Sequence, residues 1–385
     1  MKSSVSSIIR TAFFAGAFMA LTSFCVNFSN TLNGQESANS EVPAANFVKL
    51  DNGDVRIFLD SEFFAEYRAD YKGTPIIWPI CAPNKSLVTR AWPMIDDVAV
   101  DDETDTMMKT IYQNAVVSER KGVKDHPHHR SFWFNHGDVN SGDFWGGTPA
   151  NIRQARLISA KEDGKSVKLV TENYWNHDKL GRDVCRDVRT IVFCVLPELP
   201  NVRCIDFSVE VFALEDNVVF GDTKEGSFGI RVPSPMALTS RKISETWGGS
   251  ILDDAGNKDG ETWSKKAKWV NYVGPVERFL EGDELAAEFA KDSTAGDFPL
   301  TEAGIAVLNG PNSLNTLPWR HVRDYGLFAS NPFGQKDFEP QNPDANGSRK
   351  LNKGESMSFS FRVLIHNGEL TASDLDKAYA DFNNR

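Results

Sequence analysis

The sequence predicts an all-β protein, a large antiparallel β-sandwich with a short C-terminal helix. Apolar and polar residues alternate at Val167/Leu169, and the same alternation recurs at 188–192, 205–211 and 359–365. A period of two buries one face of a strand and leaves the other polar, which is typical of antiparallel sheets stacked face to face. No βαβαβ pattern, G-x-G-x-x-G motif or G-x-x-x-x-G-K-[ST] motif is present. The doubly wound nucleotide-binding folds are therefore excluded.

Three segments are expected along the 385 residues. The positively charged Lys2 and Arg10 precede a mostly apolar run, residues 11–28. Residues 1–30 are therefore predicted to be a signal peptide, with an N-terminal membrane anchor as the alternative. Residues 31–45 are predicted to be a polar tether. Residues 46–385 contain no convincing linker and are predicted to form a single β-sandwich domain. We therefore expect a secreted or periplasmic protein with no further membrane segment.

Local signals predict the elements at both ends of this domain. The turn residues 51–54 (Asp-Asn-Gly-Asp) separate two alternating runs within 47–59, which predicts a tight hairpin. Residues 96–106 are expected to be a loop, and residues 281–290 a short helix. Near the C-terminus, Ser373 is the expected helix cap. The apolar face of that helix comprises Leu375, Ala378, Tyr379 and Phe382.

Charge and cysteine content narrow the classes of partner. The formal net charge of −11 argues against a nucleic-acid partner, because phosphate binding needs a basic surface. Four cysteines follow the predicted signal, and no C-x-x-C pair exists, which argues against a structural zinc knuckle or a thioredoxin-like motif. Spacing does not pair them, so both disulfides and buried free thiols are compatible with the sequence. The four are Cys81, Cys185, Cys194 and Cys204.

Residues 125–146 hold four of the seven histidines, at positions 126, 128, 129 and 136. Histidine changes charge near neutral pH and binds metals readily, so His128 and His136 are candidate acids or bases. Arg130, Asp138 and Trp145 lie among them and are candidate substrate ligands. As an alternative, His126 and His128 on one face of a strand, with His136, could hold a divalent metal. No other cofactor is expected. The structural alternative is that these histidines bond to backbone and hold loops.

Residues 219–232 supply a second group of candidates. Glu225 is a candidate general acid or base, provided that an apolar wall raises its pKa. Lys224 and Arg231 could bind an oxyanion or a substrate carboxylate. A solvated hairpin with ordinary ion pairs is the alternative.

Residues 317–334 supply His321 as a further acid or base. Strand alternation would place Trp319, His321 and Arg323 on one side, where Trp319 and Arg323 could contact substrate. The alternative for His321 is a core histidine bonded to Asp324. Residues 263–275 contain Trp263, Trp269 and Tyr272, which could stack on sugar rings or pack in the core.

Five motifs in order resemble the PmoA-like family, a domain of unknown function in exported bacterial proteins that is often labelled "methane oxygenase PmoA". The resemblance covers most of residues 47–382, and it implies a supersandwich similar to galactose mutarotase, in which histidines and an acidic residue act on a sugar ring. Family members usually carry a histidine near position 310, where this sequence has Asn309-Gly310-Pro311. The motifs are TRAWPM (89–94), DHPHHRSFWFNHGDVN (125–140), GDTKEGSFGIRV (221–232), KKAKWVNYVGPV (265–276) and WRHVRDYGLFASNPFG (319–334).

These observations predict a secreted carbohydrate-active enzyme, an epimerase, lyase or hydrolase that acts on a sugar or an oxidised sugar through histidine and glutamate acid–base chemistry. The partner would be a small molecule or a glycan. A metal-dependent sugar enzyme and a non-catalytic glycan-binding module are the alternatives. The methane-oxygenase label is unsupported, because the membrane subunit of that name carries several transmembrane helices and this sequence has at most one.

Overall fold

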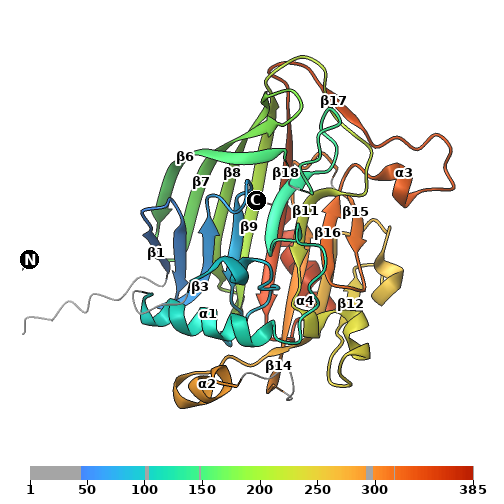
Figure 1. Cartoon of the computed structure of the whole chain (residues 1–385). Coiled ribbons are helices and arrows are strands. Elements are labelled where there is room, and N and C mark those ends of the chain that lie inside the picture. The colour runs from blue at the N-terminus through green and yellow to red at the C-terminus, as the bar shows by residue number, and fades with distance from the viewer. Residues whose placement is uncertain (1–44, 100–103, 147–148, 292–297, 316, 385) are drawn as a thin grey trace, which may run out of the picture. The chain divides into compact units, whose positions relative to one another are not determined.

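Two eight-stranded antiparallel sheets make up most of the computed structural model, which describes residues 45–99, 104–146, 149–291, 298–315 and 317–384 (Figure 1). In the order of their pairing, the strands of the first sheet are β1 (Ala45–Lys49), β2 (Val55–Leu59), β3 (Glu62–Arg68), β4 (Ile76–Ile80), β5 (Phe132–His136), β11 (Gly226–Arg231), β16 (Leu327–Asn331) and β15 (Trp319–Val322).

The second sheet has longer strands. In the order of their pairing they are β12 (Ser250–Asp253), β13 (Trp269–Glu277), β14 (Leu300–Asn309), β18 (Ser356–His366), β9 (Leu199–Ala213), β8 (Arg182–Leu196), β7 (Ser166–His177) and β6 (Asn151–Glu162). A separate two-stranded sheet pairs β10 (Val218–Phe220) with β17 (Arg349–Leu351).

The core lies between the two large sheets, because alternate residues of their strands pack against one another. Phe132 on β5 meets Phe207 on β9 with ring centroids 5.4 Å apart. Phe228 on β11 stacks on Phe361 of β18 at 4.5 Å. These rings belong to one buried cluster that draws on both sheets. The predicted large antiparallel β-sandwich is therefore confirmed, and so is the hairpin at 47–59, in which β1 pairs with β2.

Among the described residues, four α-helices and four short 3₁₀ helices lie outside the sheets. The predicted helix at 281–290 is confirmed. The predicted C-terminal helix is also confirmed, but its cap is Thr371 and not Ser373, because the Thr371 side chain accepts a hydrogen bond from the Asp374 backbone N–H and Asp374 bonds back. The helices are α1 (Thr106–Ser118), α2 (Gly282–Phe289), α3 (Gln335–Phe338), α4 (Ala372–Asn383), η1 (Met94–Asp97), η2 (Ser234–Met236), η3 (Leu238–Lys242) and η4 (Asp259–Thr262).

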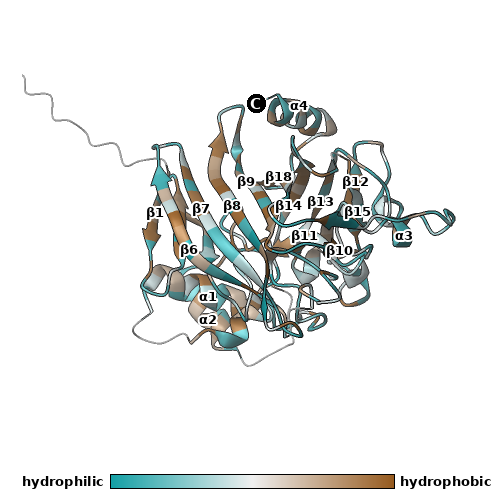
Figure 2. Cartoon of the chain, turned by 90° about the horizontal axis from the view of Figure 1, so that it is seen from above, coloured by the Kyte–Doolittle hydropathy of each residue, from teal (hydrophilic) through white to brown (hydrophobic). Residues whose placement is uncertain are grey.

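The outer face of each sheet is covered by a different helix, and Figure 2 shows α1 and α4 on opposite sides of the sandwich. Helix α1 covers the first sheet, where Tyr112 stacks on Trp78 at 5.9 Å. Helix α4 covers part of the second sheet, where Leu375 and Ala378 join a buried cluster with Leu364. Each sheet is therefore buried on two faces over part of its area.

The N-terminal predictions fall outside the described residues. These are the signal peptide or anchor at 1–30 and the tether at 31–45, of which only residue 45 is described. Within the part of the chain that the structure describes, no helix is long and apolar enough to cross a membrane. The four described cysteines are free thiols.

Candidate functional site

The candidate site lies on the outer face of the first sheet, away from the second sheet. Strand pairing places Trp133, Gly229, Ala329 and His321 in one row across β5, β11, β16 and β15. Their chain neighbours, such as Phe132 and Phe328, point to the core. A Cβ added at Gly229 would lie only 2.6 Å from the Trp133 ring, so glycine allows the indole to lie flat on the sheet.

A loop at 123–129 covers this row and is held by Arg90. The Arg90 guanidinium is fully buried and donates hydrogen bonds to the backbone carbonyls of Val123, Asp125, His126 and His129. It also donates to Asp125 Oδ1 at 2.8 Å. Burial lowers the pKa of Arg90 to about 10, so it remains charged at neutral pH. The loop is therefore organised around one buried cation.

Asp125 joins this loop to the sheet. Its Oδ1 also accepts a hydrogen bond from Arg231 on β11 at 2.7 Å, and Arg231 Nη1 lies 3.1 Å from His129 Nδ1. Because guanidinium only donates, His129 Nδ1 is the acceptor and its proton is on Nε2. Burial and the Arg231 charge hold the pKa of His129 well below its usual range. Burial alone would raise the pKa of Asp125, but Arg231 and Arg90 outweigh it and lower that pKa.

Stacked rings form the body of the site. His126 lies parallel to His129 at 4.8 Å and to Tyr325 at 4.9 Å, and His129 stacks on Trp133 at 5.5 Å. His126 Nδ1 is 3.1 Å from Asp125 Oδ2. Residues 126–129 form a turn in which the His129 N–H donates to the His126 carbonyl. The expectation that His126 and His128 share one face of a strand is therefore wrong.

The charge of Glu225 acts on both His128 and His321, which lie far apart in the sequence, and His321 bonds to the carbonyl of Lys224, the residue before Glu225. His128 is half-buried, and burial lowers its pKa while the charges of Glu225 and Asp143 partly oppose that shift. Burial lowers the pKa of His321 to about 4, again opposed by Glu225. One carboxylate thus acts on two neutral imidazoles.

The hydrogen bonds of these three residues leave several atoms available. His321 Nδ1 donates to the Lys224 carbonyl at 2.9 Å, not to Asp324, so its Nε2 is the acceptor of the ring. Neither ring nitrogen of His128 has a hydrogen-bond partner among the described residues. Glu225 is one-third exposed and pairs with Lys224 Nζ at 2.7 Å. Glu225 and His128 can therefore exchange protons at the surface, whereas His321 is only 1 % exposed.

Arg323 and Tyr325 border this group on the side of β15. The Arg323 guanidinium lies between two rings, 5.7 Å from Trp263 and 5.5 Å from Tyr325. It forms no ion pair with any described residue, and it lines a hollow of about 330 Å³ together with Trp263 and Asp324. Burial raises the pKa of the Tyr325 phenol, which stays protonated.

Two of the predicted site residues lie on other parts of the molecule. His136 falls on the core face of β5, an odd number of residues from Trp133, and its Nε2 donates to the Gly221 carbonyl. Its ring packs on Phe333 at 4.5 Å, and burial lowers its pKa to about 4. Asp138 accepts from the Ser141 N–H and stabilises a turn. The predictions for His136 and Asp138 as members of this site are wrong.

Three further candidates are buried as packing residues. Arg130 donates to the carbonyls of Tyr71 and Lys72 and holds that loop. Trp145 is 3 % exposed and packs on Trp133 at 5.2 Å. Trp319 is 5 % exposed and stacks on Phe338 of α3 at 6.1 Å. All three side chains are thus buried and engaged by neighbouring residues, and their role in substrate binding stays a prediction.

The aromatic residues of 263–275 divide in the same way. Trp269 and Tyr272 are buried in the core. Only Trp263 reaches the site, beneath Arg323.

The alternative metal site is not assembled. His126 and His128 are on the loop, whereas His136 is on the core face of β5. In the described ranges, no group of three or more histidine, cysteine, aspartate or glutamate side chains is arranged to hold a metal ion. The structure instead gives structural roles to Arg90, Asp125, His129 and Tyr325. The sequence interpretation did not assign these roles, although all four residues lie in the motifs at 89–94, 125–140 and 319–334.

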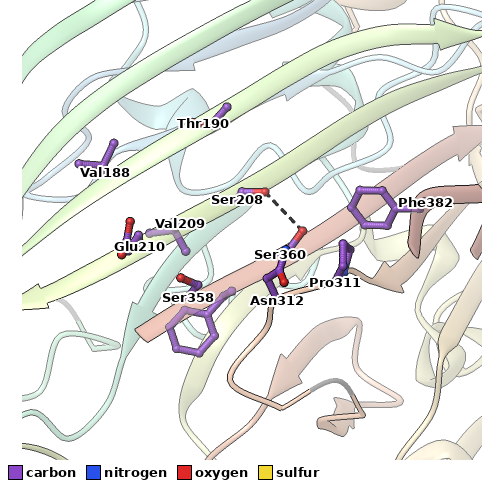
Figure 3. A pocket seen from close by; sticks show the side chains of 11 residues that line it. Val188, Thr190, Ser208, Val209, Glu210, Pro311, Asn312, Ser358, Ser360 and Phe382 are labelled. Atoms are coloured by element: carbon purple, nitrogen blue, oxygen red, sulfur yellow. Dashed lines mark hydrogen bonds between the residues drawn. The ribbon is translucent and has the colours of Figure 1, made fainter. Parts of the chain in front are cut away.

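A second hollow of about 400 Å³ lies on the outer face of the second sheet (Figure 3). Thr190, Ser208, Glu210 and Ser360 line it, and Ser208 and Ser360 are hydrogen-bonded. Gly310 adjoins it, and a Cβ there would lie 2.3 Å from Ser360 Oγ. The position of the missing family histidine is thus on the opposite side of the sandwich from His128.

Comparisons with known proteins identify a family without assigning an activity. No curated protein matches the chain. Among solved structures, a polysaccharide lyase matches at 10% identity and a TM-score of 0.28, over 82% of this chain and 34% of that one, so the chain spans about a third of the lyase. A putative mutarotase (YeaD) from Salmonella typhimurium matches at 10% identity with a TM-score of 0.27, over 85% of this chain and 95% of that one. The Slr1438 protein from Synechocystis sp. PCC 6803 matches at 10% identity with a TM-score of 0.29, over 85% of this chain and 97% of that one.

With TM-scores this low, these three similarities support no conclusion about chemistry. A family model, in contrast, matches residues 54–380, which include every residue of the candidate site. The chain therefore belongs to DUF6807, a family of unknown function.

Proposed function

We propose that this protein is a carbohydrate-active enzyme that transfers protons on a sugar or an oxidised sugar through His128, Glu225 and His321. The observation that carries the proposal is that the partly exposed Glu225 adjoins Lys224, whose carbonyl holds His321 Nδ1 at 2.9 Å. The Glu225 charge also opposes the lowering of the pKa that burial causes at both His128 and His321. A carboxylate beside neutral imidazoles offers both a proton acceptor and, once protonated, a proton donor. Groups that stabilise the fold alone are usually saturated by their neighbours, whereas His128 has unpartnered ring nitrogens among the described residues.

The roles of the three residues follow from their surroundings. Glu225 is exposed enough to meet a substrate and takes a proton from carbon or oxygen. Partial burial lowers the pKa of His128, and this residue gives or takes the second proton. His321 is held in one tautomer by the Lys224 carbonyl and presents Nε2 as an acceptor. Removal of a proton by one group and its return by another describes an epimerase or a lyase, and the same pair would activate water in a hydrolase.

Arg323 favours a carboxylated sugar over a neutral one. Arg231 and Arg130 are already occupied, by Asp125 and by backbone carbonyls respectively. Arg323 alone of these three is partly exposed, without an ion-pair partner among the described residues, and next to a hollow. A guanidinium offers paired donors that match a carboxylate. The neighbouring rings of Trp263 and Tyr325 would contact the C–H face of a sugar ring.

The test is a screen of the purified full chain against neutral sugars, uronates and keto sugars, with and without added divalent metal. Products are measured by mass spectrometry, with exchange of deuterium from solvent as a second readout that detects epimerisation. We expect turnover of at least one carboxylated sugar by the wild type. Glu225→Gln and His128→Ala should each abolish turnover while far-ultraviolet circular dichroism stays unchanged.

Three outcomes would contradict the proposal. Full activity in both variants would remove these residues from the chemistry. Saturable sugar binding with neither product nor deuterium exchange would instead identify a glycan-binding module. A strict requirement for added metal would replace acid–base chemistry by a metal-dependent reaction.

We also propose, from the N-terminal sequence, that the protein is exported, and, from its five motifs, that it resembles the PmoA-like family. Fractionation of expressing cells and N-terminal sequencing of the mature chain would test the export. Intact protein found only in the cytoplasm would contradict it.

A further inference from the structure

Two of the four described cysteines lie directly opposite each other. Cys194 on β8 and Cys204 on β9 are cross-strand partners in the antiparallel pair. The Cys204 thiol donates a hydrogen bond to Asp206 Oδ1 at 3.5 Å. Residues opposed in this way have Cα atoms about 4.5–5.5 Å apart, whereas a disulfide spans about 4.4–6.8 Å. The backbone therefore already has the spacing that a disulfide needs.

We propose that Cys194 and Cys204 form a cross-strand disulfide under oxidising conditions. The other two described thiols have no such partner. Cys185 is opposite Ala213, and Cys81 bridges to Leu87. The pairing is thus specific to one pair.

The reaction balances as thiol–disulfide exchange with a small disulfide or an oxidised dithiol protein. Cys194 is partly exposed, whereas Cys204 is fully buried. The Cys194 thiolate therefore attacks the external disulfide first, forms a mixed disulfide and releases one thiol. Cys204 then loses its proton and attacks Cys194 Sγ, which releases the second thiol. The protein loses two hydrogen atoms, and the external disulfide gains them.

The location gives the bond a structural role. It would join β8 to β9 beside their connecting turn, at Pro197 and Glu198. Cys204 belongs to the buried cluster that docks α4 on the second sheet, and Cys194 packs against that cluster. Asp206 Oδ1 accepts from Arg362 at 2.6 Å as well as from the Cys204 thiol, so this carboxylate keeps its Arg362 partner when the thiol is oxidised. A cross-link here would constrain the hairpin on which α4 rests.

The sequence makes the bond easy to detect, because Arg203 lies between the two cysteines. Trypsin separates them into a peptide ending at Arg203 and a peptide beginning at Cys204. The reduced full chain is incubated, folded, with glutathione disulfide, then acid-quenched, denatured, alkylated and digested. We expect the two peptides to appear as one linked species that a reductant separates, with two fewer alkylated thiols in the intact protein.

Cys194→Ser should abolish the linked species, and Cys185→Ser, a matched control on the core face of the same strand, should preserve it. Circular dichroism checks that both variants are folded. Two free alkylated peptides after prolonged oxidation of the folded wild type would overturn the proposal. A glutathione adduct that persists on Cys194 would also overturn it, since Cys204 would then be unable to complete the exchange.

Discussion

The outer faces of the two sheets use the same charged residue types in different ways. On the second sheet, Glu172 on β7 accepts from Arg156 at 2.7 Å and from Arg186 at 2.9 Å, on the strands to either side. Asp206 and Arg362 are directly opposed and form two hydrogen bonds. On the first sheet, Glu66 on β3 pairs in the same way with Arg56 on β2 and with Arg68 on its own strand. At the candidate site, in contrast, His128 and Arg323 lie in loops beyond strand ends and have no ionic or hydrogen-bonding side-chain partner among the described residues.

This difference shows how a charged side chain can remain available to a ligand. Within regular strands, register places opposite charges beside each other, and they neutralise one another. Beyond the strand ends the backbone no longer imposes that pairing, so a charged group can be held by rings and carbonyls and still face solvent. The second face is accordingly expected to contribute stability and the first face function.

The largest expected effect tests this contrast with the same substitution on both faces. Glu225→Gln should lower kcat by about 100- to 10,000-fold, the usual contribution of a positioned acid or base. Glu172→Gln should leave kcat unchanged, because Glu172 only joins strands. Steady-state kinetics on a substrate from the screen compares them, and urea unfolding checks that both fold. An equal kcat in the two variants would end the distinction.

The next effect concerns the cation that holds the loop. Arg90→Met should lower the free energy of unfolding by about 3–5 kcal/mol, because Asp125 and several carbonyls lose their buried partner. Arg90→Lys should fall between Met and wild type, since an ammonium cannot reach all of these acceptors. Urea unfolding measures both. A loss under about 1 kcal/mol in Arg90→Met would mean that the rings alone hold the loop.

A pH effect of intermediate size should be common to both sheets. Burial lowers the pKa of His136, His321 and His366 to about 4, whereas an unfolded histidine titrates near 6.5. Below pH 6.5 these histidines become protonated in the unfolded chain, whereas in the folded chain they stay neutral until about pH 4. The free energy of unfolding should therefore fall as the pH drops from 6.5 to 5, by up to about 2 kcal/mol for each histidine, and be insensitive to these groups above 6.5.

Urea unfolding at pH 7 and pH 5 measures this loss. His366→Gln, on the second sheet, should make the pH dependence shallower without altering kcat. Equal stability at the two pH values would show that the histidines are not protected from protonation.

The smallest effect is expected on the second face. Arg156 is 65% exposed at its side chain, and Glu172 keeps Arg186 when Arg156 is removed. Arg156→Ala should change the free energy of unfolding by less than about 1 kcal/mol. A larger loss, measured by the same urea series, would mean that this network supports the sheet more than its solvent exposure allows.

The sequence by itself predicted the fold class, an antiparallel β-sandwich with a C-terminal helix. Period-two alternation in long segments such as 205–211 is a local property, and it requires a two-faced strand wherever that strand lies. The C-terminal helix followed from equally local periodicity. Helix α1 escaped notice because its β-branched and polar residues are modest helix formers, and packing of Tyr112 on Trp78 compensates for that low propensity.

Only the tertiary structure decided which candidates meet. Glu225 approaches His128 and His321 because β5, β11, β16 and β15 are neighbours in the first sheet, although the sequence separates them widely. It also decided that His136 faces the core while His129 faces outward, and that Arg90 holds a loop 35 residues away. Long-range strand order and register depend on the packing of the whole sandwich, and no local pattern encodes them.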